Sequence, residues 1–351
     1  MSSHTTHAPG GAGVRLAIVG PSTLKGKELT EILPESTMSA ANVRLLDDEV
    51  ALGQLEAVGE EMTFVQAVAV DNFKDSDIVF FASEPAFTKQ NWPLAVRAGS
   101  AVVDLSYGLE NEAGASIRSS WLDRELAEGV PMDLQPGPVI VAHPAATVLA
   151  LLLVRAKKIA KTRSAVATVF EPASERGKKG LDELHQQTVN LLSFQSLPKD
   201  VYDAQIAFNL LSKFGATAET PLEATENKIA DHFRRIVRDN VPVPSLMLVQ
   251  ASIFHGHAFS LYLETESPVS IGDLAQALTG EHVEIVRSTE ESPSNVSAAG
   301  QESIMLTLRA DTQNKNGIWI WAATDNLRIT ALNAIGAAEQ LVASRPRGQV
   351  Q

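Results

Sequence analysis

Short apolar segments alternate with helical ones over the first part of the chain, and this alternation constrains the fold more than any other feature. The apolar segments are VRLAIVG (14–20), VRLLD (43–47), DIVFFAS (77–83), AVVDLS (101–106) and PVIVAHP (138–144). Helical segments such as LKGKELTEIL and NWPLAVRAG stand between them. Strands that alternate with helices predict an α/β domain with a parallel, doubly wound sheet, which we expect to end near residue 142.

The remainder of the chain has longer apolar segments with a different pattern. They are RSAVATVFEP (163–172), LMLVQASIF (246–254), AFSLYLETE (258–266), SIMLTLRAD (303–311) and GIWIWAATD (317–325). In the third of these, Phe259, Leu261 and Leu263 alternate with Ser260 and Tyr262, which is the period of a sheet with one buried face. We therefore expect a second, α+β domain with a mainly antiparallel sheet.

The last strand and the last helix carry further information. Trp319 and Trp321 fall on one face of the strand GIWIWAATD, and Ile318 and Ile320 fall on the other. A strand that is apolar on both faces must be covered on both, so we expect a second layer over the tryptophans. The segment DNLRITALNAIGAAEQLVAS has helical apolar spacing, and Asp325 is placed to cap a long C-terminal helix.

Length and composition exclude several functions. A chain of 351 residues exceeds a single hydrophobic core, so two domains are expected. The net charge of −13 disfavours nucleic acids and anionic membranes as partners. The absence of cysteine excludes disulfides, thiolate metal sites and thiol catalysis, and it fits a reducing compartment. No segment is typical of a signal peptide or a transmembrane helix, so a cytoplasmic protein is expected.

The loop GPSTLKG, between the first strand and the first helix, has the position of a dinucleotide phosphate loop. Gly20 and Gly26 fit such a loop, but Thr23 holds the place where a glycine lets the backbone approach the phosphate. Pro21 also removes one amide donor. The loop therefore predicts weak binding of a dinucleotide, or none.

Three carboxylates, Asp47, Asp48 and Glu49, end the second strand where the adenine ribose of a cofactor would lie. One carboxylate there can bind the ribose hydroxyls of NAD, whereas three would repel the additional phosphate of NADP. The alternative interpretation is a plain acidic turn. We expect NAD to bind weakly or no dinucleotide to bind at all, and we expect NADP to be disfavoured.

The order of six motifs resembles the aspartate-semialdehyde dehydrogenase family, including its N-acetyl-glutamyl-phosphate reductase relatives, from Val14 to Val342. The motifs are AVVDLSYGLE, ERGKKGLDELHQQ, IAFNLLSKFG, ENKIADHFRRI, FHGHAFSLYLE and DNLRITALNAIGAAE. The resemblance implies a Rossmann-type NAD(P)-binding domain, to which the C-terminal helix returns, and a catalytic and dimerisation domain. The domains expected from it are a disordered tail (1–13), the Rossmann domain (14–143), the second domain (144–324) and the C-terminal helix (325–343).

The resemblance also implies where the family's reacting groups would stand. Family members, which belong to amino-acid biosynthesis and use NADP, reduce an acyl phosphate to an aldehyde through a thioester on a cysteine in an N-P-x-C turn. The matching stretch is HPAA, and Ala146 holds the place of the cysteine. The family's glutamine corresponds to Glu171, its carboxylate-binding arginine to Gln250 and its phosphate-binding arginine to Glu110. An anionic acyl phosphate would therefore meet neutral or acidic side chains.

Some family positions remain filled by reactive side chains. His257 matches the general acid/base histidine, and Glu226 and Lys228 match a polar pair that contacts substrate. His257 alternatively is a structural, hydrogen-bonded histidine. Thr147 can supply an oxygen nucleophile or cap the helix, and His255 with His257 could face one side and bind a metal, although no metal site is expected. For a dinucleotide, the candidate contacts are Gly20, Thr23, Leu24, Gly26, Ser106 and Asn326.

Two functional hypotheses follow. The first is a catalytically silent family member that acts as a dimeric binding or regulatory protein, either as a homodimer or paired with an active relative. The second is an enzyme of altered, thiol-independent chemistry that uses His257, Glu171 and Glu226 on an uncharged or cationic substrate. A residual NAD-dependent semialdehyde oxidoreductase belongs to the same alternative.

Overall fold

The computed structural model describes residues 13–38, 42–126, 137–287 and 289–344. The chain divides into two compact units. The first contains the described residues within Met1–Ser116, Val130–Val141 and Ala331–Gln351, and the second contains those within Ile117–Gly129 and Ala142–Thr330. The tail expected at 1–13 lies, except for Gly13, outside the described residues. The other domain limits expected from the sequence stay predictions.

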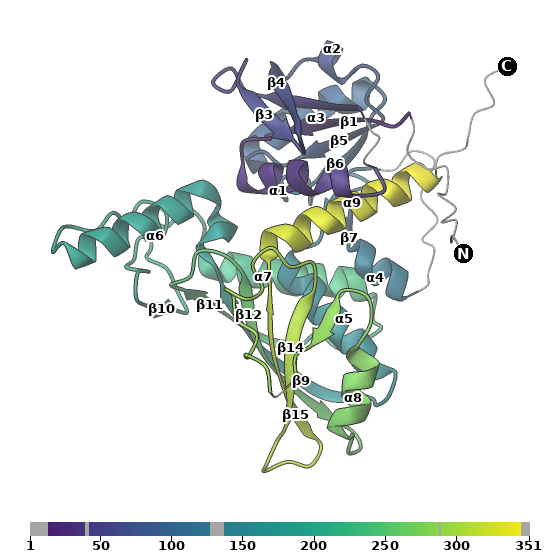
Figure 1. The fold of residues 1–351 in the computed structure, drawn as a ribbon, viewed down its shortest axis with the longest axis vertical. Coiled ribbons are helices and arrows are strands. Elements are labelled where there is room, and N and C mark those ends of the chain that lie inside the picture. The colour runs from purple at the N-terminus through teal and green to yellow at the C-terminus, as the bar shows by residue number, and fades with distance from the viewer. Residues whose placement is uncertain (1–12, 39–41, 127–136, 288, 345–351) are drawn as a thin grey trace, which may run out of the picture. The chain divides into compact units, whose positions relative to one another are not determined.

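The first unit is built on a mostly parallel sheet, as the alternating pattern predicts (Figure 1). The strand order is β3-β4-β2-β1-β5-β6-β8-β7. The strands are β1 (Arg15–Val19), β2 (Asn42–Asp47), β3 (Leu55–Val58), β4 (Glu61–Ala67), β5 (Ile78–Phe81), β6 (Ala101–Asp104), β7 (Ser116–Arg118) and β8 (Val139–Val141). The chain crosses over beside β1, because β2 lies on one side of it and β5 on the other. In doubly wound sheets, ligands bind outside the carboxyl ends of the strands at such a point.

Helices complete the first unit. They are α1 (Leu24–Ile32), the short η1 (Leu33–Glu35), α2 (Val70–Phe73) and α3 (Pro85–Arg97), together with the C-terminal part of α9 (Asn326–Ser344). Ala334, Ile335 and Leu341 of α9 belong to the same core as Leu16 and Ile18 of β1. The C-terminal helix therefore returns to the Rossmann-type domain, as the family resemblance implies.

The second unit contains a seven-stranded, mainly antiparallel sheet, which confirms the α+β expectation. Its order is β10-β11-β9-β12-β15-β14-β13. The strands are β9 (Thr162–Glu171), β10 (Leu210–Leu211), β11 (Ser245–Ala251), β12 (His257–Thr265), β13 (Val283–Ile285), β14 (Ile304–Ala310) and β15 (Gly317–Thr324). Among the described strands of this second sheet, only the β11–β9 and β13–β14 pairs run parallel.

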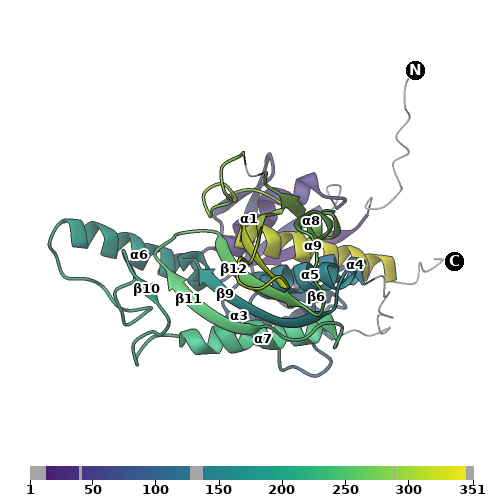
Figure 2. The ribbon, with the colours of Figure 1, turned by 90° about the horizontal axis from the view of Figure 1, so that it is seen from below.

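One face of this second sheet is covered by helices. The helices of the unit are α4 (Ser120–Glu125), α5 (Pro144–Lys157), η2 (Ala173–Arg176), α6 (Gly177–Leu192), α7 (Leu222–Val237) and α8 (Ile271–Leu278). Helices α5 and α7 pack against one another and lie over β9 and β11 (Figure 2). Phe259, Leu261 and Ile320 point to this inner face and are fully buried or nearly so.

The opposite, outer face of the second sheet is partly exposed. Trp319 and Trp321 retain 37% and 36% exposure, while Val166 retains 48% and Met247 retains 55%. These four residues define the apolar face. Tyr262 of β12 is paired with Val166 of β9 on one side and with Trp319 of β15 on the other. The side chains of these three residues therefore lie on the same face of the sheet.

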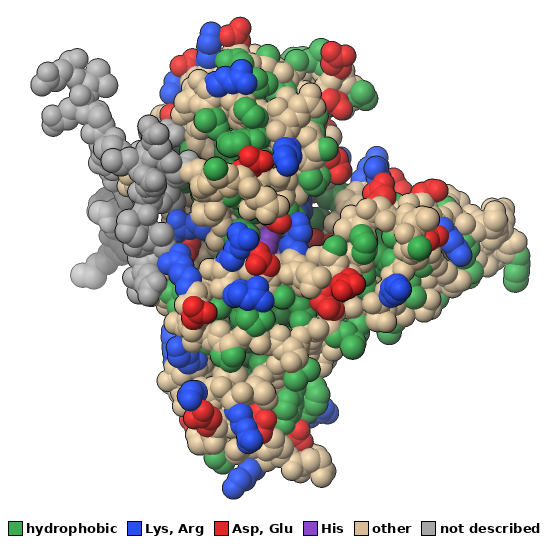
Figure 3. Space-filling model, turned by 180° about the vertical axis from the view of Figure 1, so that it is seen from behind, with side chains coloured by type: hydrophobic (Ala, Val, Ile, Leu, Met, Phe, Trp, Pro, Cys, Tyr) green, Lys and Arg blue, Asp and Glu red, His purple; other side chains and the backbone are tan. Residues whose placement is uncertain are grey.

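The surface is otherwise mixed in charge. Figure 3 shows Lys and Arg side chains interspersed with Asp and Glu side chains on the face that it displays. Among the described residues, no helix is both long enough and apolar enough to cross a membrane.

Candidate functional site

A short turn joins strand β8 to helix α5, which begins at Pro144. The start of the helix is buried. His143 caps the helix, because its Nδ1 accepts a hydrogen bond of 3.2 Å from the Ala145 amide. The His143 amide donates in turn to Nδ1 of His232 at 2.9 Å. Ala146, in the first turn, is fully buried. The methyl group of Ala146 offers no group that could react with a substrate.

Four buried polar side chains lie in a row across the inner face of the second sheet. Gln250 pairs with Glu171 between β11 and β9, and His257 pairs with Thr324 between β12 and β15. The pairing of Ala258 with Phe170 brings His257 to the place beside Glu171. All four side chains are inaccessible to solvent. We call Gln250, Glu171, His257 and Thr324 the polar row.

Each member of the polar row has a polar atom that forms no hydrogen bond with any described residue. These atoms are Oε1 of Gln250, Oε2 of Glu171, both ring nitrogens of His257 and Oγ1 of Thr324. Oγ1 of Thr147, in the first turn of α5, is in the same state. Buried polar atoms in proteins are nearly always paired, so such a concentration is unusual for a structural core.

Arg176 holds the other oxygen of Glu171. Its Nη2 donates to Oε1 of Glu171 at 3.0 Å and to Oγ1 of Thr225 at 2.9 Å. Burial raises the pKa of the Glu171 carboxyl to about 7, although the Arg176 charge acts in the opposite direction and the Glu175 charge adds to the rise. Glu171 therefore titrates near neutral pH, where a carboxyl group can either donate or accept a proton.

His257 is neutral at physiological pH. Burial lowers the pKa of its imidazole, and the charges of Glu175 and Asp325 only partly offset this effect. A neutral imidazole has one nitrogen that donates and one that accepts, so His257 presents one of each. Its ring centre lies 5.7 Å from that of His143.

Glu175 and Asn326 form a second buried group beside the row. Oε2 of Glu175 lies 3.6 Å from Nε2 of His143, and Oε1 accepts a hydrogen bond of 2.7 Å from Nδ2 of Asn326. Oδ1 of Asn326 accepts from the Gly256 amide and from Ser174. Because these partners engage both the oxygen and the nitrogen of its amide, the Asn326 side chain forms its hydrogen bonds inside the second unit.

The remaining residues expected in the substrate site are more dispersed. Glu226 on α7 accepts a hydrogen bond of 2.7 Å from the Leu248 amide, and Lys228 lies half-buried on the same helix. Glu110 belongs to the first unit. His255 and His257 do not occupy alternate positions of one strand, because β12 begins at His257 and His255 is exposed before it. Among the described residues, no cluster of three or more potential ligands could hold a metal ion.

Sequence reasoning missed Glu175, Arg176 and His143. Glu175 and Arg176 were noted only as part of the motif ERGKKG, yet two opposite charges follow a buried strand that ends in Glu171. Charged side chains that follow a buried strand are rarely buried unless they are paired, so these two opposite charges indicated a polar site. Gly180 supports this arrangement, because a Cβ at Gly180 would lie 2.5 Å from Cβ of Arg176 and 2.6 Å from the Tyr202 hydroxyl.

In the loop after β1 of the first unit, the Thr23 side chain forms hydrogen bonds with the backbone of the same loop and of Ala82. Oγ1 of Thr23 lies 2.9 Å from the carbonyl oxygens of Gly20 and Ala82, and it accepts a hydrogen bond of 3.0 Å from the Gly26 amide. Thr23 is thus the N-cap of α1, whose first residue is Leu24. Gly20 has a φ of 81°, and a Cβ there would meet Cα of Ser83 at 2.7 Å.

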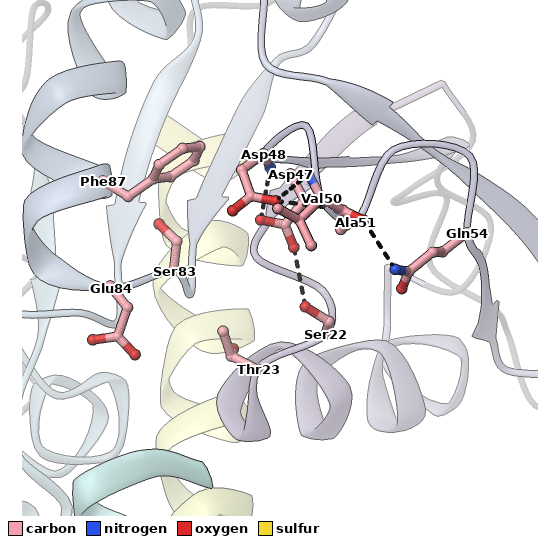
Figure 4. A pocket seen from close by; sticks show the side chains of 10 residues that line it. All are labelled: Ser22, Thr23, Asp47, Asp48, Val50, Ala51, Gln54, Ser83, Glu84 and Phe87. Carbon is pink, nitrogen blue, oxygen red and sulfur yellow. Dashed lines mark hydrogen bonds between the residues drawn. The ribbon is translucent and has the colours of Figure 1, made fainter. Parts of the chain in front are cut away.

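A pocket of about 370 Å³ lies beside this loop (Figure 4). Asp47 and Asp48 line one side of it, and Ser83 and Phe87 line the other. Asp47 accepts a hydrogen bond of 3.1 Å from Ser22, and burial raises the pKa of its carboxyl.

Six of the residues expected near the nucleotide do not line the described pocket, namely Gly20, Leu24, Gly26, Glu49, Ser106 and Asn326. Glu49 is exposed and lies outside the lining. Ser106 donates a hydrogen bond of 2.6 Å to Asp104 at the end of β6, and it does not line the pocket either.

Two family descriptions match the chain. Residues 15–137 match the semialdehyde dehydrogenase NAD binding domain, and residues 153–329 match the semialdehyde dehydrogenase dimerisation domain. An aspartate-semialdehyde dehydrogenase of Rickettsia bellii is 26% identical over 336 residues, which cover 93% of this chain and 97% of that protein. A USG-1 protein homolog of Pseudomonas aeruginosa is 27% identical over 332 residues, which cover 94% and 98%.

Solved structures share the fold. A probable aspartate-semialdehyde dehydrogenase from Pseudomonas aeruginosa superposes with a TM-score of 0.82 at 25% identity, covering 94% of this chain and 98% of that one. Aspartate semialdehyde dehydrogenase II from Vibrio cholerae gives 0.83 at 23% identity with the same coverage. The second likeness concerns the fold alone.

Proposed function

The chain belongs to the semialdehyde dehydrogenase family, and from that premise we propose that it is a homodimeric member that binds a ligand without the family's thioester chemistry. The observation that carries this proposal is Ala146. It lies in the first turn of α5, where the family's nucleophile is expected, and the sequence contains no cysteine elsewhere. A methyl group cannot form a thioester.

The side chains at the expected anion-binding positions support the same proposal. The two positions expected to bind anions hold Gln250 and Glu110. The Arg176 guanidinium lies beside the row, but Glu171 and Thr225 engage its Nη2. An acyl phosphate in this place would therefore meet the Glu171 carboxyl group, which is already hydrogen-bonded to the Arg176 guanidinium.

The apolar face supports dimer formation. Residues 153–329 match a dimerisation domain, and the face formed by Val166, Met247, Trp319 and Trp321 lies within that range. Exposed apolar surfaces of this kind are typical of association sites. We propose that a second copy of the chain covers this face.

The first unit fits a dinucleotide only in part. Asp47 lines the pocket and can accept hydrogen bonds from ribose hydroxyls. The start of α1 suits a pyrophosphate less well than Asp47 suits the ribose, because the Gly26 amide already donates its hydrogen bond to Oγ1 of Thr23. We propose that NAD binds weakly and NADP more weakly still.

An assay of the purified protein tests the proposal. Aspartate semialdehyde, phosphate and either NAD or NADP are mixed with the protein, and formation of the reduced nicotinamide is followed at 340 nm. We expect no rate above that of a control without enzyme. Robust turnover that disappears in a His257→Ala variant would overturn the proposal.

One observation favours an alternative function. Glu171, whose pKa is raised to about 7, stands beside the neutral His257 in the polar row. A carboxyl group that titrates near neutrality beside a neutral imidazole is typical of acid/base catalysis. In this alternative the protein is an enzyme that acts on an uncharged or cationic substrate with Glu171, His257 and Glu226.

A further inference from the structure

We propose that the polar row binds a small planar cation of the amidine or guanidine class, with its N–H groups directed at Glu171 and Gln250. This inference rests on the proposed function of a binding protein, and it names the ligand class of the same unit. It depends on four observations: the alignment of the row, its unpartnered atoms, their hydrogen-bonding type and the surrounding charge.

The alignment of the row follows from strand register. Directly paired residues on neighbouring strands project to the same face, and neighbouring strands lie about 4.8 Å apart. Gln250 and Glu171 are paired in this way, and His257 and Thr324 continue the row on the next two strands. The side chains of Gln250 and Glu171 can therefore contact one compact molecule together.

The orientation of the Gln250 amide is fixed by its own hydrogen bonds. Its Nε2 donates to the carbonyl oxygens of Glu171 and Ala251, both at 3.0 Å. This leaves Oε1 as the atom that no described residue contacts. The unpartnered oxygen of Glu171 is Oε2, because Oε1 accepts from Arg176.

The unpartnered atoms of Gln250 and Glu171 are thus both hydrogen-bond acceptors when the Glu171 carboxyl is ionised. A molecule that satisfies them must carry at least two N–H or O–H donors. An amidinium or guanidinium ion presents two parallel N–H groups in one plane, which is the arrangement that pairs with neighbouring oxygens. His257 and Thr324 each offer a donor and an acceptor, so they accommodate the remainder of the ligand.

The charge around the row also favours a cation. Glu171, Glu175 and Asp325 act on the row as carboxylates, and Arg176 is the cation that opposes them. Acetate or phosphate would add a further negative charge in a buried place, which is unfavourable. An amidinium ion instead compensates the excess of carboxylates.

Calorimetric titration of the purified protein with acetamidinium chloride at pH 8 tests the inference. Ligand concentrations from about 0.1 to 20 mM suit a molecule of this size. Sodium chloride, sodium acetate and acetamide, the neutral analogue, are titrated in parallel. We expect saturable binding of acetamidinium alone. Heat no greater than that from sodium chloride, or equal binding of neutral acetamide, would overturn the inference.

Two variants locate the ligand. Gln250→Leu removes the Oε1 acceptor, and Glu171→Gln removes the charge; each should weaken acetamidinium binding at least tenfold. Gln195→Leu, at an exposed position of the same unit, is the matched control and should bind unchanged. Circular dichroism verifies that each variant is folded. Undiminished binding by both folded row variants would refute the location.

A second readout uses the unaltered protein. With ¹⁵N-labelled histidine, the ring signals of His257 should shift as acetamidinium saturates, and a His257→Gln variant assigns them. Absence of any His257 shift at saturation contradicts the inference. Its failure remains distinguishable from that of the proposed function, because an inactive dimer that binds no amidine refutes the ligand alone, whereas semialdehyde turnover refutes the function.

Discussion

At the scale of single residues, the expected position of the nucleophile and that of one anion-binding group hold side chains that cannot do this chemistry. Ala146 stands at the first position and Gln250 at the second, while the Arg176 guanidinium is paired with Glu171. The helix start itself is regular, with His143 capping α5. A fold does not by itself carry a chemistry, so the proposed loss of activity is compatible with an intact turn.

Restoring the nucleophile alone should not restore the reaction. In Ala146→Cys the thiol would stand at the N-terminus of α5, where the helix dipole favours the thiolate. We expect reaction of this thiol with iodoacetamide under mild denaturation, but no semialdehyde turnover above a blank, because Gln250 and Glu110 do not bind an anion. Turnover recovered by this single change would show that those two positions matter little.

Glu171 should make stability depend on pH. Its pKa is raised to about 7 in the folded protein, above its ordinary value near 4.5, so the folded state holds the proton more tightly. The stabilisation is complete below about pH 4.5 and is lost as the pH rises to 7. The shift corresponds to a contribution on the order of 3 kcal/mol.

Urea unfolding at pH 5 and pH 7.5 measures this effect. Relative to Glu171→Gln, the unaltered protein should lose free energy of unfolding between the two pH values. Glu219→Gln changes an exposed glutamate of the same unit that pairs with Lys179; this matched control retains Glu171 and should therefore lose as much free energy of unfolding as the unaltered protein does. Parallel pH dependence of the Glu171 variant and the unaltered protein would contradict the assignment.

At the scale of elements, hydrophobic periodicity predicts most of the structure. The five short apolar segments of the first unit and the five longer ones of the second all form strands, and Asp325 caps α9 as expected through the amides of Leu327 and Arg328. The β3–β4 hairpin was missed because both strands are largely exposed, and their apolar side chains Leu55, Met62 and Phe64 face solvent. Edge strands give this weak signal because one face meets water.

The candidate site was less predictable than the fold. His257, Glu171 and Gln250 were identified as separate positions from the family resemblance, but their alignment depends on strand register. Gln250 and Glu171 are 79 residues apart in the chain and pair only through β11 and β9. Periodicity specifies which face a residue takes, and it does not specify which residue stands opposite it.

The N-cap of α1 should control dinucleotide binding. In Thr23→Gly the Gly26 amide loses its intramolecular acceptor and becomes available to a phosphate, at a small loss of helix stability. One additional hydrogen bond to a charged group corresponds to roughly a tenfold gain in affinity. Fluorescence titration with NADH should show this gain. Ser270→Gly, which removes the N-cap of α8, is the control and should leave the NADH affinity unaltered.

The acidic end of β2 should select between cofactors. Asp47 lines the pocket with a buried carboxylate, which would repel the 2′-phosphate of NADP. We expect the dissociation constant for NADPH to exceed that for NADH, and Asp47→Asn to narrow the difference. Tighter binding of NADPH by the unaltered protein would place the ribose away from Asp47.

At the scale of the whole molecule, the apolar face of the second unit favours association with another chain. Val166, Trp319 and Trp321 are more than a third exposed in an isolated chain, although the strands that carry them are central to the sheet. An isolated sheet face of this kind is covered in stable proteins. We therefore expect a homodimer whose interface buries about 2,000 Å² or more, as is common for obligate partners.

Sedimentation equilibrium at low micromolar concentration measures the assembly. We expect twice the chain mass of 37.6 kDa for the unaltered protein. Trp319→Glu should shift the equilibrium towards the monomer, because it places a charge in the centre of the apolar face. Val50→Glu introduces the same charge at an exposed apolar residue of the first unit and should leave the dimer intact. A chain-sized particle for the unaltered protein refutes the dimer, and an intact Trp319→Glu dimer moves the interface away from this face.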